Sequence, residues 1–498
     1  MRRQNARSAG RRLVINSRTR LPAAGDLVVS AGAGVTGLPV VRYLAGTGAT
    51  VLVTSDRPPP AGLSEIAGDV TFAGDRATIP DAVALVVTSA GIPPHHPLLA
   101  SAVDAGVEVI GEAELAWRID HAGDQNAAAA GTDRLSPGRV RTGPRPWLVV
   151  TGTNGKTTTV GMLEAMLRAA GRQVTACGNV GWPVLEAVLA GSADRTDQPA
   201  QEFIVAELSS FQLHYAPSVR PRAGLVLNLA QDHLDWHGSM DAYAAAKAVA
   251  LTGDIAAAVV DDPGAAALLA GAPAGRRIGV TAAEPSTGQI GVVGHRVIDR
   301  AFGLGELFET SAVRLAGAHH LTNAMGAAAL ALAVGVTPPV IDQALAGFQL
   351  GAHRNQPVGE VGGVRYLNDS KATNPHAAAA SLLAHERVVW IAGGQLKGAR
   401  VDELVLAAAD RLAGVVLLGI DAPVIQDALA RHAPDVPRIL VARTDDGAMD
   451  EAVRVASTLA APGTVVVLAP AAASLDMFGS YAARGEAFAR AVAALDRS

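Results

Sequence analysis

Short apolar runs separated by segments of helical periodicity extend from residue 26 to residue 468. Strands of a parallel sheet are buried on both faces by their crossover helices, so they appear in a sequence as near-continuous apolar runs. The pattern therefore predicts an α/β protein. Predicted strands lie at residues 26–30, 50–54, 85–88, 107–110, 146–150, 173–177, 202–207, 224–228, 257–260, 364–367, 388–391, 415–418, 439–441 and 465–468.

The same pattern predicts three domains. We expect a Rossmann-like N-terminal domain over residues 26–121, a central domain with a parallel sheet and a P-loop over 146–350, and a Rossmann-like C-terminal domain over 351–498. Residues 122–145 are rich in Ala, Gly, Asp, Arg and Pro without periodicity and predict a linker. Residues 1–25 are Arg-rich without an apolar core and predict a disordered extension, with a transit peptide as the alternative.

The segment TGTNGKTTT, Thr151 to Thr159, follows one apolar run and precedes a helical pattern. A strand, a Gly-containing turn and a helix N-terminus together form an anion site, in which backbone N–H groups and the helix dipole face phosphate oxygens. Val150 stands where the general P-loop has its first Gly, which predicts a tighter variant; a plain turn is the alternative. The predicted ATP-binding residues are Gly152, Thr153, Asn154, Gly155, Lys156, Thr157 and Thr158.

A second glycine motif, GAGVTG, covers Gly32 to Gly37 and is followed 19 residues later by Asp56. This is the spacing of a dinucleotide fingerprint, and the same turn would hold the pyrophosphate of a UDP-sugar. The motif therefore leaves both ligands open. Another loop, Ser89 to Ile92, lies at the predicted carboxyl edge of the same sheet, where such sheets bind ligands.

Several polar residues follow predicted strands of the other two domains. Glu207 beside a P-loop suits Mg²⁺, and a solvated strand-end acid is the alternative. His233 and His237 have zinc-like spacing, but we favour His233 as a group beside Mg²⁺ or phosphate. Lys247 by pattern belongs to a solvated helix face. Arg354 and the segment Asp369 to Lys371 are predicted to close on the nucleotide.

Composition limits the partners. The formal charge of −5 and the absence of a long basic stripe argue against nucleic acid. The single cysteine, Cys177, excludes an intramolecular disulfide and fits a reducing cytoplasm. No apolar run reaches about 18 residues, so we expect no membrane span. We predict a cytoplasmic enzyme that is a monomer.

The motifs together resemble the Mur ligase family, the ATP-dependent amide-forming enzymes of peptidoglycan synthesis, and the resemblance covers about residues 27 to 495. Within the family, NDSKATN (Asn368 to Asn374), the Gly393-Gly394 loop with Lys397, and ASLDMF (Ala473 to Phe478) are similar to the D-glutamate-adding branch. The resemblance implies ligation of D-glutamate to UDP-N-acetylmuramoyl-L-alanine through an acyl phosphate, with ATP and Mg²⁺.

The resemblance also implies roles for matched positions. Lys247 matches a carbamylated lysine that binds metal, which reverses the interpretation from pattern alone, and Lys156, His233 and Arg354 complete the expected catalytic set. Thr157, Glu207, His233 and carbamylated Lys247 are the expected metal ligands, and Asn323, Arg354 and Asp369 the expected further ATP contacts. The UDP-substrate is expected at Thr36, Asp56, Arg57, Gly91 and Asn179, and D-glutamate at Thr373, Lys397, Ser474, Leu475 and Tyr481.

Four departures from the family pattern remove no phosphate or metal group. His320 replaces an Asn after His319, Gly351-Ala352 replace Leu-Pro, Tyr481 replaces a frequent Phe, and no Cys precedes Ser474. Three other functions stay open: a folylpolyglutamate synthase, against which NDSKATN argues; an NAD-dependent protein built on GAGVTG; and a nucleotide-binding module without catalysis.

Overall fold

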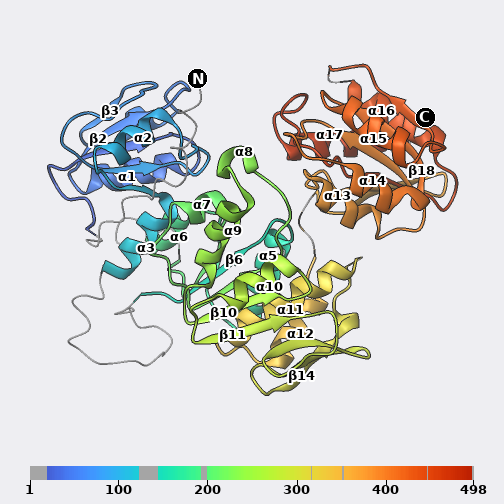
Figure 1. Cartoon of the computed structure of the whole chain (residues 1–498), viewed down its shortest axis with the longest axis horizontal. Coiled ribbons are helices and arrows are strands. Elements are labelled where there is room, and N and C mark those ends of the chain that lie inside the picture. Colours follow the sequence, from blue (N-terminus) through green and yellow to red (C-terminus); the bar gives the residue numbers. More distant parts are fainter. Residues whose placement is uncertain are drawn as a thin grey trace, which may run out of the picture.

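Three α/β domains follow one another along the chain, each built on its own sheet (Figure 1). This confirms the predicted fold class. The computed structural model describes residues 20–122, 144–191, 199–315, 317–349, 351, 353–445 and 447–495. Most of the predicted extension 1–25 and linker 122–145, and also Ala352, therefore lie outside the described residues. Among the residues described, no helix combines the length and apolar character needed to cross a membrane.

The N-terminal sheet has the strand order β3-β2-β1-β4-β5, and all its neighbouring pairs are parallel. The chain reverses its direction of winding at β1, so the loops after β1 and β4 flank the crevice where such sheets bind ligands. The elements are β1 (Leu27–Ala31), α1 (Gly37–Gly46), β2 (Thr50–Thr54), η1 (Leu63–Glu65), β3 (Val70–Phe72), β4 (Val83–Thr88), α2 (Pro97–Asp104), β5 (Val109–Gly111) and α3 (Glu112–Ala122).

The central sheet has the order β14-β13-β12-β11-β10-β9-β6-β8-β7. Its elements are β6 (Trp147–Thr151), α5 (Lys156–Ala169), β7 (Ala176–Gly178), α6 (Val184–Leu189), β8 (Ile204–Glu207), α7 (Ser210–His214), β9 (Ala223–Val226), α8 (Leu234–His237), α9 (Met240–Ala248), η2 (Val249–Leu251), β10 (Ile255–Val259), α10 (Pro263–Ala270), β11 (Arg276–Val280), β12 (Gln289–Val293), β13 (Arg296–Asp299), β14 (Gly305–Glu309), η3 (Thr310–Ala312), α11 (Ala318–Leu332) and α12 (Pro338–Ala346).

One edge of the central sheet corrects the prediction of a parallel sheet. The strands β12, β13 and β14 pair antiparallel. A two-residue turn joins the first two strands, with Gly294 at a φ of +61° that a tight hairpin requires. These edge strands are half exposed, so they lack the continuous apolar run that is typical of the buried strands.

The C-terminal sheet has the order β15-β16-β20-β17-β18-β19, parallel except for β15. The carboxyl ends of β16, β20 and β17 are therefore neighbours. The elements are β15 (Gln356–Val361), β16 (Val364–Asn368), α13 (Pro375–Leu382), β17 (Val388–Gly393), α14 (Asp402–Ala408), η4 (Ala409–Arg411), β18 (Leu412–Leu418), α15 (Ala422–His432), β19 (Arg438–Leu440), α16 (Ala448–Leu459), β20 (Val465–Leu468) and α17 (Tyr481–Leu495).

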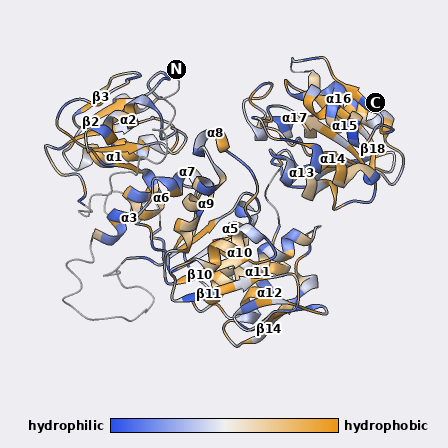
Figure 2. Ribbon diagram, in the orientation of Figure 1, coloured by the Kyte–Doolittle hydropathy of each residue, from blue (hydrophilic) through white to orange (hydrophobic). Residues whose placement is uncertain are grey.

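The domains differ in how they are joined. Apolar residues concentrate on the strands of each sheet, whereas the helices carry both apolar and polar residues (Figure 2). One buried apolar cluster combines residues of the N-terminal domain, such as Leu115 on α3, with residues of the central domain, such as Trp147 and Leu185. The two apolar clusters of the C-terminal domain, by contrast, contain residues of that domain alone. The first two domains therefore share a core that the third does not.

Candidate functional site

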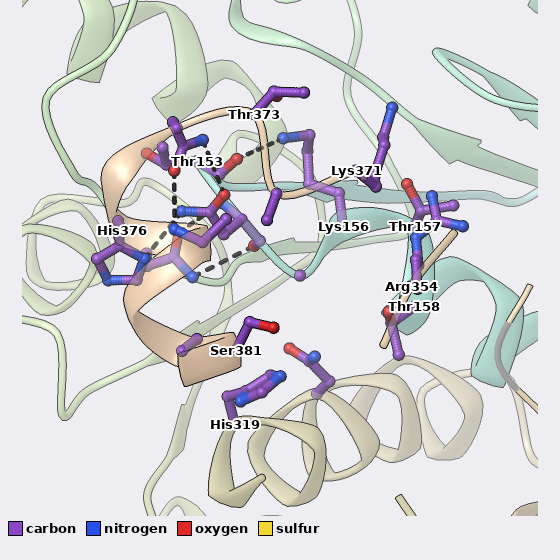
Figure 3. Close-up of a pocket in the computed structure, with 18 of the residues that line it drawn as sticks. Thr153, Lys156, Thr157, Thr158, His319, Arg354, Lys371, Thr373, His376 and Ser381 are labelled. Atoms are coloured by element: carbon purple, nitrogen blue, oxygen red, sulfur yellow. Dashed lines mark hydrogen bonds between the residues drawn. The ribbon is translucent and has the colours of Figure 1, made fainter. Parts of the chain in front are cut away.

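The carboxyl ends of β8, β6 and β9 lie side by side in the central sheet, and they face the loop after β16 of the C-terminal domain across a cavity of about 330 Å³. Figure 3 shows α11 of the central domain and α13 of the C-terminal domain as further walls. The structure thus gathers most of the predicted nucleotide and metal residues. Those that line the cavity are Thr153, Asn154, Gly155, Lys156, Thr157, Thr158, Glu207, His233, Asn323, Arg354 and Asp369. Asn179, predicted for the UDP-substrate, and Thr373, predicted for D-glutamate, line the same cavity.

The loop between β6 and α5 has the conformation expected of a phosphate-binding loop. Gly155 has a φ of +82°, and a Cβ there would lie 2.6 Å from Asn323 Oδ1, so both backbone and space require glycine. Lys156 begins α5, and its Nζ donates to the carbonyl oxygens of Gly152 and Thr153 at 2.9 and 2.8 Å. The loop therefore presents a lysine and a helix N-terminus to the cavity.

Lys247 lies behind this loop and not on a solvated helix face, which corrects the interpretation from pattern alone. Its side chain is 1% exposed, and its Nζ donates to the Gly152 carbonyl oxygen at 2.8 Å. Burial lowers the pKa of Lys247 well below its ordinary value, and the neighbouring Lys156 lowers it further. The amine is thus held in an environment that favours its neutral, nucleophilic form.

Glu207 ends β8 and presents an unsatisfied carboxylate oxygen. Its Oε1 accepts from Asn179 Nδ2 at 2.7 Å, while its buried Oε2 has no hydrogen-bond partner among the described residues. Hard divalent cations prefer carboxylate and hydroxyl oxygens next to phosphates, and the Thr157 hydroxyl lines the same cavity. The donor set therefore fits Mg²⁺. Asn179, predicted to contact the UDP-substrate, lies here beside Glu207.

His233 caps α8 with a left-handed φ of +54°, a strained conformation that often marks functional positions. Burial lowers the pKa of His233. The negative charge of Asp232 acts in the opposite direction, and the positive charge of Lys397, from the C-terminal domain, lowers the pKa further. Lys397 is therefore close enough to act on the central domain. His237 instead bonds Ser210 Oγ at 2.9 Å, and the described residues hold no group of three or more His, Cys, Asp or Glu arranged for a metal ion, which gives no support to zinc.

The C-terminal wall carries a cluster of charged groups. Burial raises the pKa of Asp369 to about 6, although the Asn355 N–H at 3.1 Å and nearby Arg354 act in the opposite direction. Burial also lowers the pKa of Lys371 to about 8, and Arg354 adds to this effect. The Lys371 ammonium lies 4.0 Å from the centre of the Tyr481 ring, which holds it by a cation–π contact. The wall therefore presents two cations beside the phosphate loop.

The far end of the cavity is formed by α11. His319 and Asn323 line the cavity, and the ring centroids of His319 and His320 are 4.0 Å apart. Burial lowers the pKa of His320 to about 3, so this ring is neutral at pH 7. His320, which stands where the family pattern has an Asn, is therefore a buried and uncharged side chain.

Some predicted residues lie elsewhere. Thr36, Asp56, Arg57 and Gly91 follow β1, β2 and β4 at the carboxyl edge of the N-terminal sheet. In the C-terminal domain, Ser474 is buried and Leu475 is 64% exposed, and both follow β20. These positions are separate from the residues that line the nucleotide cavity.

Sequence reasoning missed His376, which lines the cavity from α13. The signal available was its place in Asn374-Pro375-His376: Asn and Pro predict a helix N-terminus next to NDSKATN. Asn374 indeed caps α13, since its side chain accepts from the Ala377 N–H. The cap brings His376 to the edge of the phosphate loop.

Family models match all three domains. They are the "Mur ligase MurD-like, N-terminal domain" over residues 26–111, the "Mur ligase middle domain" over 150–331, and the "Mur ligase, glutamate ligase domain" over 353–472. Solved structures with the same fold include UDP-N-acetylmuramate-alanine ligase MurC from Thermotoga maritima, at 16% identity and a TM-score of 0.53 over 94% of this chain and 99% of the other. MurF from Acinetobacter baumannii, at 16% identity, has a TM-score of 0.57 over 97% and 92%.

Curated relatives are much more similar in sequence. The UDP-N-acetylmuramoylalanine–D-glutamate ligase of Mycolicibacterium smegmatis is 48% identical over 94% of this chain and 97% of its own length. The enzyme of the same name from Thermobifida fusca is 48% identical over 95% and 99%, and that of Rhodococcus jostii is 46% identical over 95% and 96%. The chain belongs to the Mur ligase family.

Proposed function

We propose that this chain joins D-glutamate to UDP-N-acetylmuramoyl-L-alanine with ATP, through an acyl phosphate, in the synthesis of peptidoglycan precursors. The relatives at 46–48% identity carry this activity in their names. The observation in the structure that supports it best is the cavity itself, in which a phosphate-binding loop faces the NDSKATN segment of another domain. Such a cavity suits a phosphoryl transfer followed by attack of a second substrate.

In the proposed first step, an oxygen of the L-alanine carboxylate attacks the γ-phosphorus of ATP, the bond to the β-phosphate oxygen breaks, and ADP leaves. Lys156 and the N–H groups at the start of α5 hold the phosphates, and Arg354 meets the charge that spreads over the transferred group. Thr157 and Glu207 would hold Mg²⁺, which neutralises phosphate charge when bound. Asn323 and Asp369 complete the proposed nucleotide contacts.

In the second step, the amine of D-glutamate attacks the acyl carbon, phosphate leaves, and the amine loses its proton. We assign D-glutamate to Thr373, Lys397, Ser474, Leu475 and Tyr481, because the carboxyl ends of β16, β20 and β17 are adjacent. The electrostatic effect of Lys397 on His233 supports placing this end of the domain next to the phosphate loop. His233 is proposed to contact the phosphate or metal side of the site.

We further propose that Lys247 is carbamylated. A neutral amine attacks the carbon of CO₂ and loses a proton, and the product is an anion that can bind a cation. The 1% exposure and lowered pKa of Lys247 support this reaction. As an ammonium, Lys247 would share the Gly152 carbonyl with the Lys156 ammonium, an arrangement of like charges that carbamylation removes.

The UDP-substrate is assigned to the N-terminal domain. Thr36, Asp56, Arg57 and Gly91 follow strands that are neighbours in the sheet, at the point where the winding reverses. Backbone N–H groups of the glycine-rich turn suit a pyrophosphate. Asn179, which lies beside Glu207, is proposed to meet the muramoyl end. We also propose domain limits of 26–121, 146–350 and 351–498, a cytoplasmic location and a monomeric state.

The test is phosphate release with UDP-N-acetylmuramoyl-L-alanine, ATP and Mg²⁺, scored for each member of an amino-acid panel that includes D- and L-glutamate. We expect release with D-glutamate, and loss of turnover in Lys156→Ala. Arg168→Ala, at the exposed far end of the same helix, is the control and should keep wild-type activity. Absence of release with D-glutamate, or full activity in Lys156→Ala, would contradict the proposal.

A further inference from the structure

The phosphate-binding loop is also where the C-terminal domain touches the central domain by hydrogen bonds. Asn374 Nδ2 donates to Asn154 Oδ1 at 3.1 Å, and Asn154 Nδ2 lies 2.9 Å from Nδ1 of His376. Within the described ranges, each hydrogen bond between these two domains involves the Asn154 side chain. Figure 3 shows His376 at this contact. One loop residue thus joins the nucleotide site to the domain that faces it.

The direction of this hydrogen-bond chain is fixed at one end. Asn374 Oδ1 accepts from the Ala377 N–H at 2.9 Å as the cap of α13, so its Nδ2 is the group left to donate to Asn154. Asn154 Oδ1 is then the acceptor, and its Nδ2 must donate to His376. His376 Nδ1 therefore accepts, which requires a neutral ring with its proton on Nε2.

The backbone of Asn154 is held just as firmly from the central domain. Its N–H donates to Asn228 Oδ1 at 2.8 Å, and its carbonyl oxygen accepts from Asn228 Nδ2 at 3.2 Å. A continuous path of hydrogen bonds therefore runs from α13 through the Asn154 side chain to the backbone of the loop and to Asn228. The buried apolar clusters of the C-terminal domain contain no residue of the central domain, so they do not fix this arrangement.

We propose that Asn154, Asn374 and His376 form a latch that docks the C-terminal domain on the phosphate-binding loop, with His376 as a positioning residue for the nucleotide. This proposal rests on the proposed function in one respect only, namely that the cavity binds a nucleotide. Docking brings Arg354, Asp369 and Thr373 to the cavity as its second wall. Without the latch, the C-terminal wall is docked in a smaller fraction of the molecules. The apparent dissociation constant for the nucleotide then rises in inverse proportion to that fraction.

The latch is tested by calorimetric titration of the full chain with Mg²⁺ and AMP-PNP, a non-hydrolysable ATP analogue. A neutral hydrogen bond is worth about 1 kcal/mol, so His376→Ala should weaken binding about threefold to tenfold. His376→Asn places an oxygen acceptor near the position of Nδ1 and should bind within about twofold of wild type. His295→Ala, in the exposed turn between β12 and β13, is the matched control and should also bind like wild type.

A double variant distinguishes a shared bond from two separate defects. If His376 acts through Asn154, then Asn154→Ala combined with His376→Ala should bind no more weakly than Asn154→Ala alone. Additive losses, or binding of His376→Ala that equals the His295→Ala control, would overturn the latch. Thermal unfolding of each variant shows whether a loss reflects misfolding, and His376→Asn keeps the test valid if His376→Ala unfolds.

Failure of the latch and failure of the proposed function give different results. Titration with AMP-PNP needs neither D-glutamate nor turnover, so the latch is measured even if the amino-acid panel shows no phosphate release. In the active enzyme the latch predicts a larger rise in the KM for ATP than fall in kcat for His376→Ala, since the residue positions the wall and does not touch the reacting atoms. Unchanged KM with reduced kcat would contradict it.

Discussion

Glu112 provides a pH-dependent test of how the first two domains are joined. It begins α3 and is 6% exposed, facing α6 of the central domain. Its Oε1 accepts from the Leu185 N–H at 2.5 Å, while its buried Oε2 has no hydrogen-bond partner among the described residues. Burial, with a smaller contribution from Glu186, raises the pKa of Glu112 from 4.5 to about 7, and the Leu185 N–H opposes the rise.

The sign and size of the effect on stability follow from this pKa. Because the folded state binds the proton more tightly than the unfolded state, the stability from protonated Glu112 is complete below pH 4.5 and is lost as pH rises to about 7. The step between these values corresponds to about 3 kcal/mol. Glu112→Gln keeps an acceptor for Leu185 and carries no charge. Its stability relative to wild type should therefore increase by about 2–3 kcal/mol between pH 5 and pH 8.

Urea unfolding followed by tryptophan fluorescence measures this difference. The ring centroids of Trp117 on α3 and Trp147 on β6 are 5.1 Å apart, so the fluorescence of these two residues reports on the joined N-terminal and central domains. Glu65→Gln, at an exposed glutamate of the N-terminal domain, is the control and should not change with pH relative to wild type. If the difference between Glu112→Gln and wild type is the same at pH 5 and pH 8, the assignment of a buried, protonated Glu112 is wrong.

Three further substitutions, one of them with a matched control, test packing by chemical denaturation. Arg484→Met should destabilise the C-terminal domain by about 2–4 kcal/mol, because the 1% exposed guanidinium donates to buried oxygens that would lose their donor. Gly393→Ala should lower the free energy of unfolding by more than about 4 kcal/mol, since the added Cβ would lie 1.7 Å from the Leu418 carbonyl oxygen. Gly463→Ala is its control: Gly463 also has a positive φ, but an added Cβ would meet no atom within 4 Å, so the loss should be about 1–2 kcal/mol. Arg118→Met should cost about 3–5 kcal/mol at pH 7, because it leaves two buried carboxylates without their cation.

Much of the fold and the phosphate site could be predicted because the signals are local. Buried parallel strands need continuous apolar runs, and the predicted run at residues 465–468 is β20 itself. The loop from Gly152 to Gly155 needs glycine at its left-handed positions whatever the rest of the protein does. Residues that follow neighbouring parallel strands must meet at one edge, so the positions of Glu207 and Lys156 after their strands already predict that the two lie close together.

Other features depend on contacts between distant segments and leave little trace in the sequence. Lys247 has the pattern of a solvated helical lysine, and its burial depends on how α9 packs behind the phosphate loop. The strands β12 to β14 are half exposed and carry no continuous apolar run. His376 becomes part of the cavity only because the cap at Asn374 places it against Asn154, more than 200 residues earlier in the chain.

The way the domains are joined constrains how catalysis can be organised. The first two domains share a buried apolar cluster, so a change in their relative position would expose apolar surface to water. The C-terminal domain has apolar clusters of its own and touches the phosphate loop through polar side chains, which water can replace at small cost. Closure should therefore be a movement of the C-terminal domain, with the nucleotide adding the contacts that complete the cavity.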